Sequence, residues 1–306
     1  MLAEVFYWIL NISIIGTITG LIILLFRTIK AFPRSLLYLL WLVVLIRMTI
    51  PFGIANKFSL MNLISKFTTK TVFINGVESF PGLSTSNFIM GADKYFPIVY
   101  KTKMLETIFG IASMIWIIIA LSGIIAAGLL YYFTKSEIKN AEHLKDNIYK
   151  SASVSTPTVY GIFNPKIILP VGMAKNNIYY ILAHENIHIK RKDNLFRVIA
   201  IVTACLHWFN PFTWILLKSF FIDMELTCDA KVLKNLSAKE KKDYAFALFD
   251  CSGYSKTFMA SAFGSSKIKV RIENILSYRK LTIISGIFFG ILFAAVIIVL
   301  LTNAKI

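Results

Sequence analysis

Long apolar runs constrain this sequence more than any other feature. Val5 to Phe26, Ile108 to Phe133 and Leu281 to Leu301 each reach the roughly 20 residues with which a helix crosses the hydrocarbon core of a bilayer. Inside a bilayer no water is available to an unpaired backbone group, so apolar runs of this length form helices. The sequence therefore predicts an integral membrane protein that is mainly α-helical.

A shorter apolar run, Leu36 to Ile50, is interpreted as the second of four spans. Three basic residues lie between it and the first span, namely Arg27, Lys30 and Arg34. A further 22 of the 33 basic residues fall between Thr134 and Lys280. Because Lys and Arg are enriched on the cytoplasmic side of membrane proteins, we expect both stretches inside the cell, near anionic lipid head groups, and both termini outside.

The four spans divide the chain into three parts. Residues 1–133 hold three spans with an outer loop at 52–103, residues 134–280 form one inserted cytoplasmic domain, and residues 281–306 hold the fourth span. The chain is 57% hydrophobic, against about 45–50% in soluble domains, which excludes an ordinary soluble enzyme and a disordered chain. Its three cysteines are odd in number and lack a C-x-x-C spacing, which predicts reduced thiols.

Residues 134–280 show the pattern of an α+β domain. One very apolar stretch, Phe196 to Ile222, is interrupted at Asn210-Pro211 and fits a fifth span, a re-entrant hairpin or two core helices. The basic residues that follow favour a hairpin or core helices. The other expected elements are a helical linker at Thr134–Lys150, strands at Ser153–Val159 and Lys166–Val171, and helices at Asn176–Arg191, Met224–Leu236 and Lys239–Phe249.

The segment His184-Glu185-Asn186-Ile187-His188 matches the motif H-E-x-x-H within a helical run. Residues four apart on a helix lie on one face, so both imidazoles can bind one metal ion. Neutral imidazole is a common ligand of zinc. Glu185 can then act as the general base on the metal-bound water without being a ligand itself. We predict a zinc site with His184 and His188 as ligands and Glu185 as the catalytic residue.

A third ligand is needed because a catalytic zinc keeps three protein ligands and one open position. Glu225 and Asp229, one helical turn apart, supply an E-x-x-x-D pair. We expect Glu225 to bind the metal and Asp229 to accept a hydrogen bond from a ligand imidazole, which fixes the tautomer of that imidazole. Cys228, three residues after Glu225, is an alternative ligand. Two histidines and one glutamate are the ligand set of a gluzincin-like protease.

Taken together, these motifs resemble the membrane-embedded BlaR/MecR-type antirepressor metalloproteases. The order of the spans carries the resemblance over the whole chain, whereas motif-level similarity is confined to Ser155 through Asp229. The segments that carry it are His184 to His188, Glu225 to Asp229, Thr156 to Pro170 with its Asn164-Pro165-Lys166, His188 to Asp193, and His207 to Pro211.

The resemblance implies a zinc metalloendopeptidase of the cell membrane that cleaves a cytoplasmic transcriptional repressor and so transduces a signal. Its partners would be that repressor and membrane lipid, without direct contact to nucleic acid. The family's outer C-terminal penicillin-binding sensor domain is not expected in this chain. The signal would then arrive through the outer loop, the spans, a separate sensor protein or a homodimer.

The resemblance also suggests that the linker before the fourth span is cleaved by its own protease domain. We expect the stretch Ser261 to Gly264 to occupy the active site at rest and to be cut on activation. The alternative is an ordinary loop that leads into a membrane-surface helix at Ile268–Tyr278.

Two details of the mechanism stay open from the sequence. His207, Tyr244 and Tyr254 are all candidate donors to the oxyanion, and His207 is also explained as a core histidine. The region Val159 to Leu169 offers either a strand edge for an extended substrate or a structural hairpin.

Two other functions share part of the pattern. A CAAX-prenyl-protease-like membrane enzyme also has H-E-x-x-H and E-x-x-x-D, but the small number of spans and the Asn-Pro-Lys strand region favour the antirepressor type. A non-proteolytic membrane protein that binds metal would need the same ligands. The candidate ligands fall outside the four predicted spans, which argues against transport.

Overall fold

The computed structural model describes residues 2–29, 31–50, 54–62, 103–253, 268–278 and 282–304. Most of the predicted outer loop, Tyr254 and the stretch Ser261 to Gly264 lie outside the described residues. Contacts divide the chain into two units. The membrane unit comprises Met1–Ile124, Ile201–Leu217 and Thr282–Ile306, and the sheet unit comprises Ile125–Ala200 and Lys218–Leu281.

Three helices are long and apolar enough to cross a membrane in the described part of the chain. They are α1 (Leu2–Thr28), residues Thr107–Ser136 within α6 (Lys103–Glu137), and α12 (Ile283–Leu301). The run interpreted as the second span forms α2 (Arg34–Thr49), whose 16 residues extend only about 24 Å. Since the hydrocarbon core is about 30 Å thick, a fourth full span stays a prediction.

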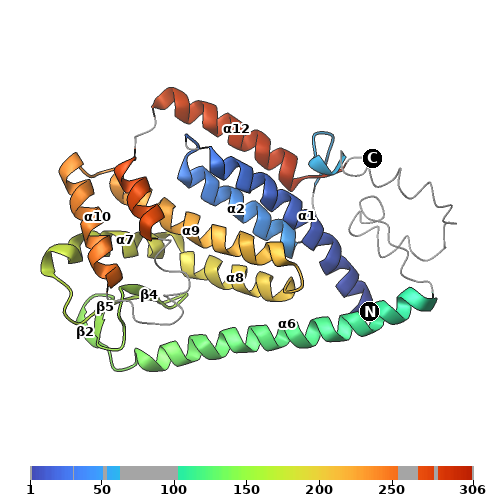
Figure 1. The fold of residues 1–306 in the computed structure, drawn as a ribbon, viewed down its shortest axis with the longest axis horizontal. Helices are drawn as coiled ribbons and strands as arrows, with labels where there is room; N and C mark the ends of the chain where they lie inside the picture. Colours follow the sequence, from blue (N-terminus) through green and yellow to red (C-terminus); the bar gives the residue numbers. More distant parts are fainter. Residues whose placement is uncertain are drawn as a thin grey trace. The chain divides into compact units, whose positions relative to one another are not determined.

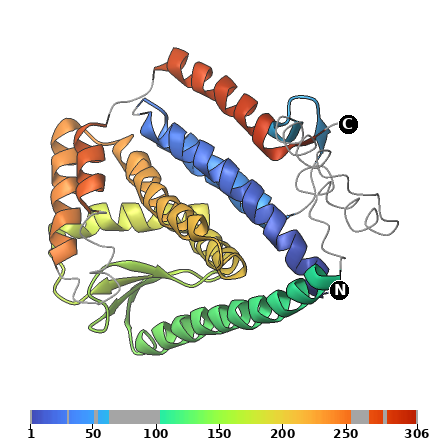
Figure 2. The same cartoon turned by 45° about the vertical axis from the view of Figure 1, so that its right-hand side comes forward.

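Within the membrane unit, α2 packs against both α1 and α12, and the three helices run side by side in Figures 1 and 2. Small residues on α1 allow close packing. A Cβ on Gly16 would lie 2.3 Å from the Met48 side chain, and one on Gly20 would lie 2.4 Å from Leu216. Small residues at helix contacts are typical of membrane helices, where backbones approach closely.

The apolar stretch that the sequence left ambiguous forms two helices, α8 (Asp193–Leu206) and α9 (Pro211–Leu233), with the predicted break at Asn210-Pro211. The turn between α8 and α9 is held within the membrane unit by side-chain hydrogen bonds. Asn210 Nδ2 donates to Thr17 Oγ1 over 2.7 Å, and His207 Nε2 lies 2.9 Å from the Met48 carbonyl oxygen. The prediction of a separate helix from Met224 to Leu236 is wrong, because α9 continues to Leu233. The polarity changes at Asp223, but no helix-breaking residue accompanies it.

The sheet unit contains four strands in the order β2-β3-β5-β4. They are β2 (Glu142–Lys145), β3 (Ile148–Ser151), β4 (Thr158–Tyr160) and β5 (Lys166–Pro170). β2 and β4 pair antiparallel with their neighbours, whereas β3 and β5 are parallel. The strand predictions at Ser153–Val159 and Lys166–Val171 are thus confirmed in part.

The predicted helical linker at Thr134–Lys150 is wrong beyond Glu137, because β2 and β3 form a hairpin there. Asp146 at its turn has a φ of 48°, a left-handed conformation that Asp and Asn tolerate better than most residues. Asp146-Asn147 was therefore a turn signal. The exposed, charged β2 has no apolar alternation to mark it as a strand.

The end of α9 packs with the sheet together with α7 (Lys175–Arg191), α10 (Ala238–Gly253) and a helix over 268–276. They meet in one core that includes Ile167 of β5, Ile181 of α7, Tyr244 of α10 and Ile275. The predictions for α7 and α10 are confirmed. A helix within the expected Ile268–Tyr278 is confirmed, and Ile275, which is 1% exposed, lies in this core, whereas Leu276 is exposed. Its position at a membrane surface stays a prediction.

Candidate metal centre

Helix α7 places the two histidines of the H-E-x-x-H motif on one face, as predicted. His184 Nε2 and His188 Nε2 lie 3.1 Å apart, and both side chains are buried. Two nitrogens that bind the same zinc tetrahedrally, each at about 2.0–2.1 Å, are separated by about 3.3 Å. The pair therefore has the spacing of two ligands to one ion.

Glu225 of α9 brings a carboxylate to the same point. Its Oε2 lies 3.3 Å from His184 Nε2 and its Oε1 lies 3.6 Å from His188 Nε2. Arg197 Nη2 donates to Oε1 over 2.8 Å from the other side and holds the carboxylate in place. The ligand atoms of these three residues all lie within 4.8 Å of one another, so two nitrogens and one oxygen converge as a metal site requires.

The second ring nitrogen of His188 is held by Asp193, for which the sequence predicts no role. His188 Nδ1 lies 2.7 Å from Asp193 Oδ2, and Asp193 is fully buried. A carboxylate at this position orients a ligand imidazole and fixes the proton on Nδ1. α7 ends in a left-handed turn at Lys192, whose φ is 57°, and this turn directs Asp193 back toward His188.

The structure places Cys228 on this same outer side of His188. Its Sγ lies 3.4 Å from His188 Nδ1 and 3.5 Å from Asp193 Oδ2. A metal site built from these three residues would need the Nδ1 nitrogen that already pairs with Asp193. The geometry therefore favours Glu225 over Cys228 as the third ligand.

The outer nitrogen of His184 contacts two residues, Tyr244 and Asp229. The Tyr244 hydroxyl lies 2.9 Å from His184 Nδ1 and donates to Asp229 Oδ1 over 2.5 Å, while Asp229 Oδ1 itself is 3.2 Å from Nδ1. If His184 donates its Nδ1 proton to the tyrosine oxygen, all three groups are satisfied and the Nε2 lone pair is left for a metal. Asp229 thus acts on His184 partly through Tyr244.

These contacts bear on the three candidate oxyanion donors. Tyr244 lies behind His184, on the side away from the convergent ligand atoms, and its hydroxyl is engaged there. His207 belongs to the membrane unit and contacts the Met48 carbonyl oxygen. Tyr254 lies outside the described residues. We therefore assign no oxyanion role to Tyr244 or His207.

Arg271, on the 268–276 helix, brings a guanidinium into the site. It forms two hydrogen bonds to the carboxylate of Asp229, Nε to Oδ2 over 2.8 Å and Nη2 to Oδ1 over 2.7 Å. Burial alone would raise the pKa of Asp229, but Arg271 and the hydrogen bond with His184 outweigh it, so this pKa lies below its ordinary value. Asp229 is thus held ionised beside His184.

Comparison with known proteins identifies the class of this site. A family model described as BlaR1 peptidase M56 matches residues 7–275. The chain belongs to this peptidase family. With three helices long and apolar enough to cross a bilayer, it is a membrane protein of the M56 class.

Curated relatives of this M56 peptidase are longer proteins. It is 31% identical over 159 residues to the regulatory protein BlaR1 of Bacillus licheniformis. The aligned region covers 49% of this chain and 26% of that protein. The methicillin resistance mecR1 protein of Staphylococcus aureus is 30% identical over 138 residues, or 42% of this chain and 24% of that protein. BlaR1 of Staphylococcus aureus is 26% identical over 291 residues, or 83% and 48%. The chain spans at most about half the length of these relatives.

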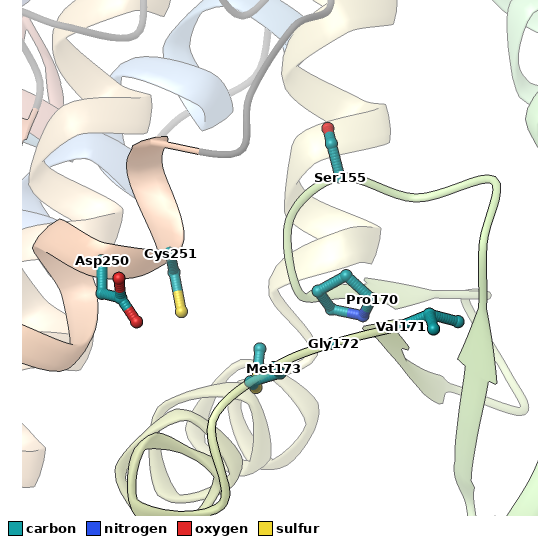
Figure 3. Close-up of a pocket in the computed structure, with 7 residues that line it drawn as sticks. All are labelled: Ser155, Pro170, Val171, Gly172, Met173, Asp250 and Cys251. Carbon is teal, nitrogen blue, oxygen red and sulfur yellow. The ribbon is translucent and has the colours of Figure 1, made fainter.

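Glu185 of the H-E-x-x-H segment lies close enough to Cys251, which lines a pocket, for its charge to raise the pKa of that thiol. Glu185 is 9% exposed, and no hydrogen bond or ion pair joins its carboxylate to another described residue. Burial, Asp250 and the Glu185 charge raise the pKa of Cys251 to about 11, so this thiol stays protonated. Cys251 lines the pocket together with Ser155, Asp250 and the segment from Pro170 to Met173 that joins β5 to α7 (Figure 3).

The edge of β4 is partly engaged in this M56 peptidase. Asn194 Nδ2 donates to the carbonyl oxygens of Val159 and Gly161, over 3.0 Å and 2.9 Å. Val159 lies in β4, and Gly161, whose φ is 100°, directly follows the strand, so Asn194 occupies one acceptor of this edge strand and one just beyond its end. An extended substrate that pairs with this edge would have to share these two acceptors with Asn194.

Proposed function

We propose that this chain is a membrane-embedded zinc metalloendopeptidase with Glu185 as its catalytic residue. The observation that carries the proposal is the convergence of His184 Nε2, His188 Nε2 and the Glu225 carboxylate beside that glutamate. Two neutral imidazoles and one carboxylate suit zinc and leave a coordination position open. Asp193 and Asp229 support the proposal because each orients one of the two imidazoles.

The chain's own residues then divide the work of peptide hydrolysis. Zinc, when bound, supplies a Lewis acid that polarises the scissile carbonyl group and lowers the pKa of a water molecule. Glu185 takes the proton from the attacking water and delivers it to the leaving amine. We assign a small apolar side chain of the substrate to the mainly apolar pocket at Cys251 and Met173, because Cys251 lies near Glu185.

The substrate that we propose is a cytoplasmic transcriptional repressor, with the domain of residues 134–280 on the cytoplasmic side of the membrane. The names of the matched relatives, a regulatory protein and a methicillin resistance protein, support a regulatory role. The 22 basic residues between Thr134 and Lys280 support the orientation. Self-cleavage at Ser261 to Gly264 is part of the same proposal, on residues outside those that the structure describes.

The zinc site is tested by metal analysis of the full-length chain purified in detergent. We expect one zinc ion per chain in the wild type. Zinc content should fall well below one in His184→Ala and Glu225→Ala, because each substitution removes one of three ligands. Unchanged zinc content in both variants would rule out this ligand set.

The role of Asp193 is tested by Asp193→Asn, which keeps the side-chain shape but removes the charge that orients His188. We expect the zinc affinity to fall by about 10- to 100-fold, as is usual when the partner of a ligand imidazole is lost. Competition with a zinc chelator measures this affinity. Cys228→Ala is the matched control, because it alters the same surroundings of His188 and should leave the affinity nearly unchanged. A larger loss in Cys228→Ala than in Asp193→Asn would make the thiol the ligand.

A further inference from the structure

Arg271 reaches the metal ligands themselves, and the mechanism above gives it no task. Its Nη2 lies 3.3 Å from His184 Nε2, and its Nη1 lies 3.4 Å from Glu225 Oε2. Both of these atoms belong to the proposed ligand set. The same guanidinium also holds both oxygens of Asp229, so one side chain contacts two proposed ligands and the carboxylate behind one of them.

The contact with His184 disfavours metal binding at the same nitrogen. With its proton on Nδ1, an imidazole has a single lone pair on Nε2. Arg271 Nη2 is bonded at the same time to Asp229 Oδ1, which lies 3.2 Å from Nδ1 of the same ring, so it approaches Nε2 well away from the axis of the lone pair. A metal ion on that lone pair would lie beside a guanidinium of like charge, and the two cations would repel each other. The Glu225 carboxylate is different, because its two oxygens have about four acceptor positions and can serve an arginine and a metal together.

We infer that Arg271 regulates metal loading by competing with the metal at His184 Nε2. Metal binding then requires Arg271 to withdraw from His184 while it stays paired with Asp229. The short bonds to Asp229 anchor the guanidinium near the site, and the longer contacts to His184 and Glu225 are the ones that break. This inference rests on the proposed zinc site and adds a regulation to it.

The competition couples metal affinity to the position of the 268–276 helix. Arg271 lies on this helix, which is anchored in the core of the sheet unit by Ile275 and is followed along the chain by α12. Because the coupling is reciprocal, a metal that weakens the contact of Arg271 with the ligands is itself bound more weakly when that contact is strengthened, by the same factor. The helix that precedes the last span is therefore a point at which metal loading can be controlled.

Two substitutions of Arg271 test the competition in the full-length chain. Arg271→Lys keeps the positive charge but lacks the planar guanidinium group, whose several N–H donors contact Asp229 and His184 together. Arg271→Gln removes the charge and keeps a polar side chain. We expect both variants to bind zinc about three- to tenfold more tightly than the wild type in chelator competition, because no guanidinium then lies beside Nε2. A merely structural role for Arg271 predicts the opposite sign, since a loosened site binds zinc less well.

Lys269→Gln is the matched control. Lys269 lies on the same helix and is exposed, so this variant removes one positive charge without touching a ligand. Its zinc affinity should equal that of the wild type. Equal or weaker zinc binding in Arg271→Lys and Arg271→Gln, with normal thermal stability in the presence of zinc, would overturn the inference and leave the zinc site standing. A wild-type chain that binds no zinc would overturn the proposed function and this inference with it.

A measurement on the wild type covers the case in which neither variant folds. Amide hydrogen exchange of residues 268–276 should become faster when zinc replaces the chelator, because Arg271 then gives up its contacts with His184 and Glu225. Exchange in β5, which carries no ligand, should not change. Equal exchange of the 268–276 helix with and without zinc would contradict the competition.

Discussion

Glu185→Gln is expected to reduce peptide-bond cleavage by about 10²- to 10⁴-fold, the usual contribution of a positioned general acid and base. The substitution keeps the size of the side chain and removes the oxygen that accepts the proton. Because Glu185 is not among the three convergent ligands, the zinc content should stay at one per chain. Loss of cleavage while zinc is retained would show that Glu185 acts as a general base and is not a metal ligand.

Cells that express the wild type or Glu185→Gln provide the measurement, by mapping the N-termini of cellular peptides. N-termini that occur only with the wild type mark the cleavage sites and identify the substrate. Asn186→Ala is the matched control, because Asn186 is the exposed neighbour in the same motif and should leave cleavage intact. Equal cleavage by Glu185→Gln and the wild type would exclude the protease and favour a membrane protein that binds metal without hydrolysis.

The H-E-x-x-H helix could be predicted because its information is local. The spacing of His184 and His188 fixes their common face as soon as the segment is helical, and the structure places both nitrogens together. Glu225 could be proposed because a third ligand is chemically required and Glu225 and Asp229 form an E-x-x-x-D pair on one helical face. The structure brings it to the two histidines from α9.

Asp193 lies close to the H-E-x-x-H motif in the sequence, but no role could be predicted for it. It follows His188 by five residues, a spacing that points away from the histidine on a continuous helix. Only the left-handed turn at Lys192, which a lysine rarely adopts, brings the carboxylate back to 2.7 Å. The β2–β3 hairpin was missed for a related reason, because a turn at Asp146-Asn147 outweighed the helical composition around it.

Arg271 and the true position of Tyr244 could not be predicted. They lie 87 and 60 residues from His184 along the chain, and only the packing of α10 and the 268–276 helix on the common core brings them to it. A basic residue just before a membrane span is ordinarily explained by the lipid surface. The burial of Ile275, which no local pattern reveals, turns Arg271 inward instead.

Asp229→Ala is expected to destabilise the sheet unit by about 3–5 kcal/mol, because it leaves the charge of Arg271, whose side chain is only 16% exposed, without its closest partner. Asp229 is 1% exposed and also accepts from Tyr244, so the tyrosine hydroxyl loses its acceptor in the same variant. The measurement should be made with a chelator present, so that weaker zinc binding does not contribute. All five tryptophans lie in the membrane unit, so pulse proteolysis in urea reports on the sheet unit better than fluorescence does.

Asp243→Ala is the control for this variant, since Asp243 is an exposed carboxylate next to Tyr244 and its loss should change stability by at most about 0.5 kcal/mol. The double variant Asp229→Ala with Arg271→Ala completes a mutant cycle. Removing both charges leaves no buried ion without a partner, so the double variant should be less unstable than the sum of the two single variants. Additive losses would mean that Asp229 and Arg271 do not stabilise each other. Asp229 would then act on His184 alone, and Arg271 would lack the anchor from which it reaches the metal ligands.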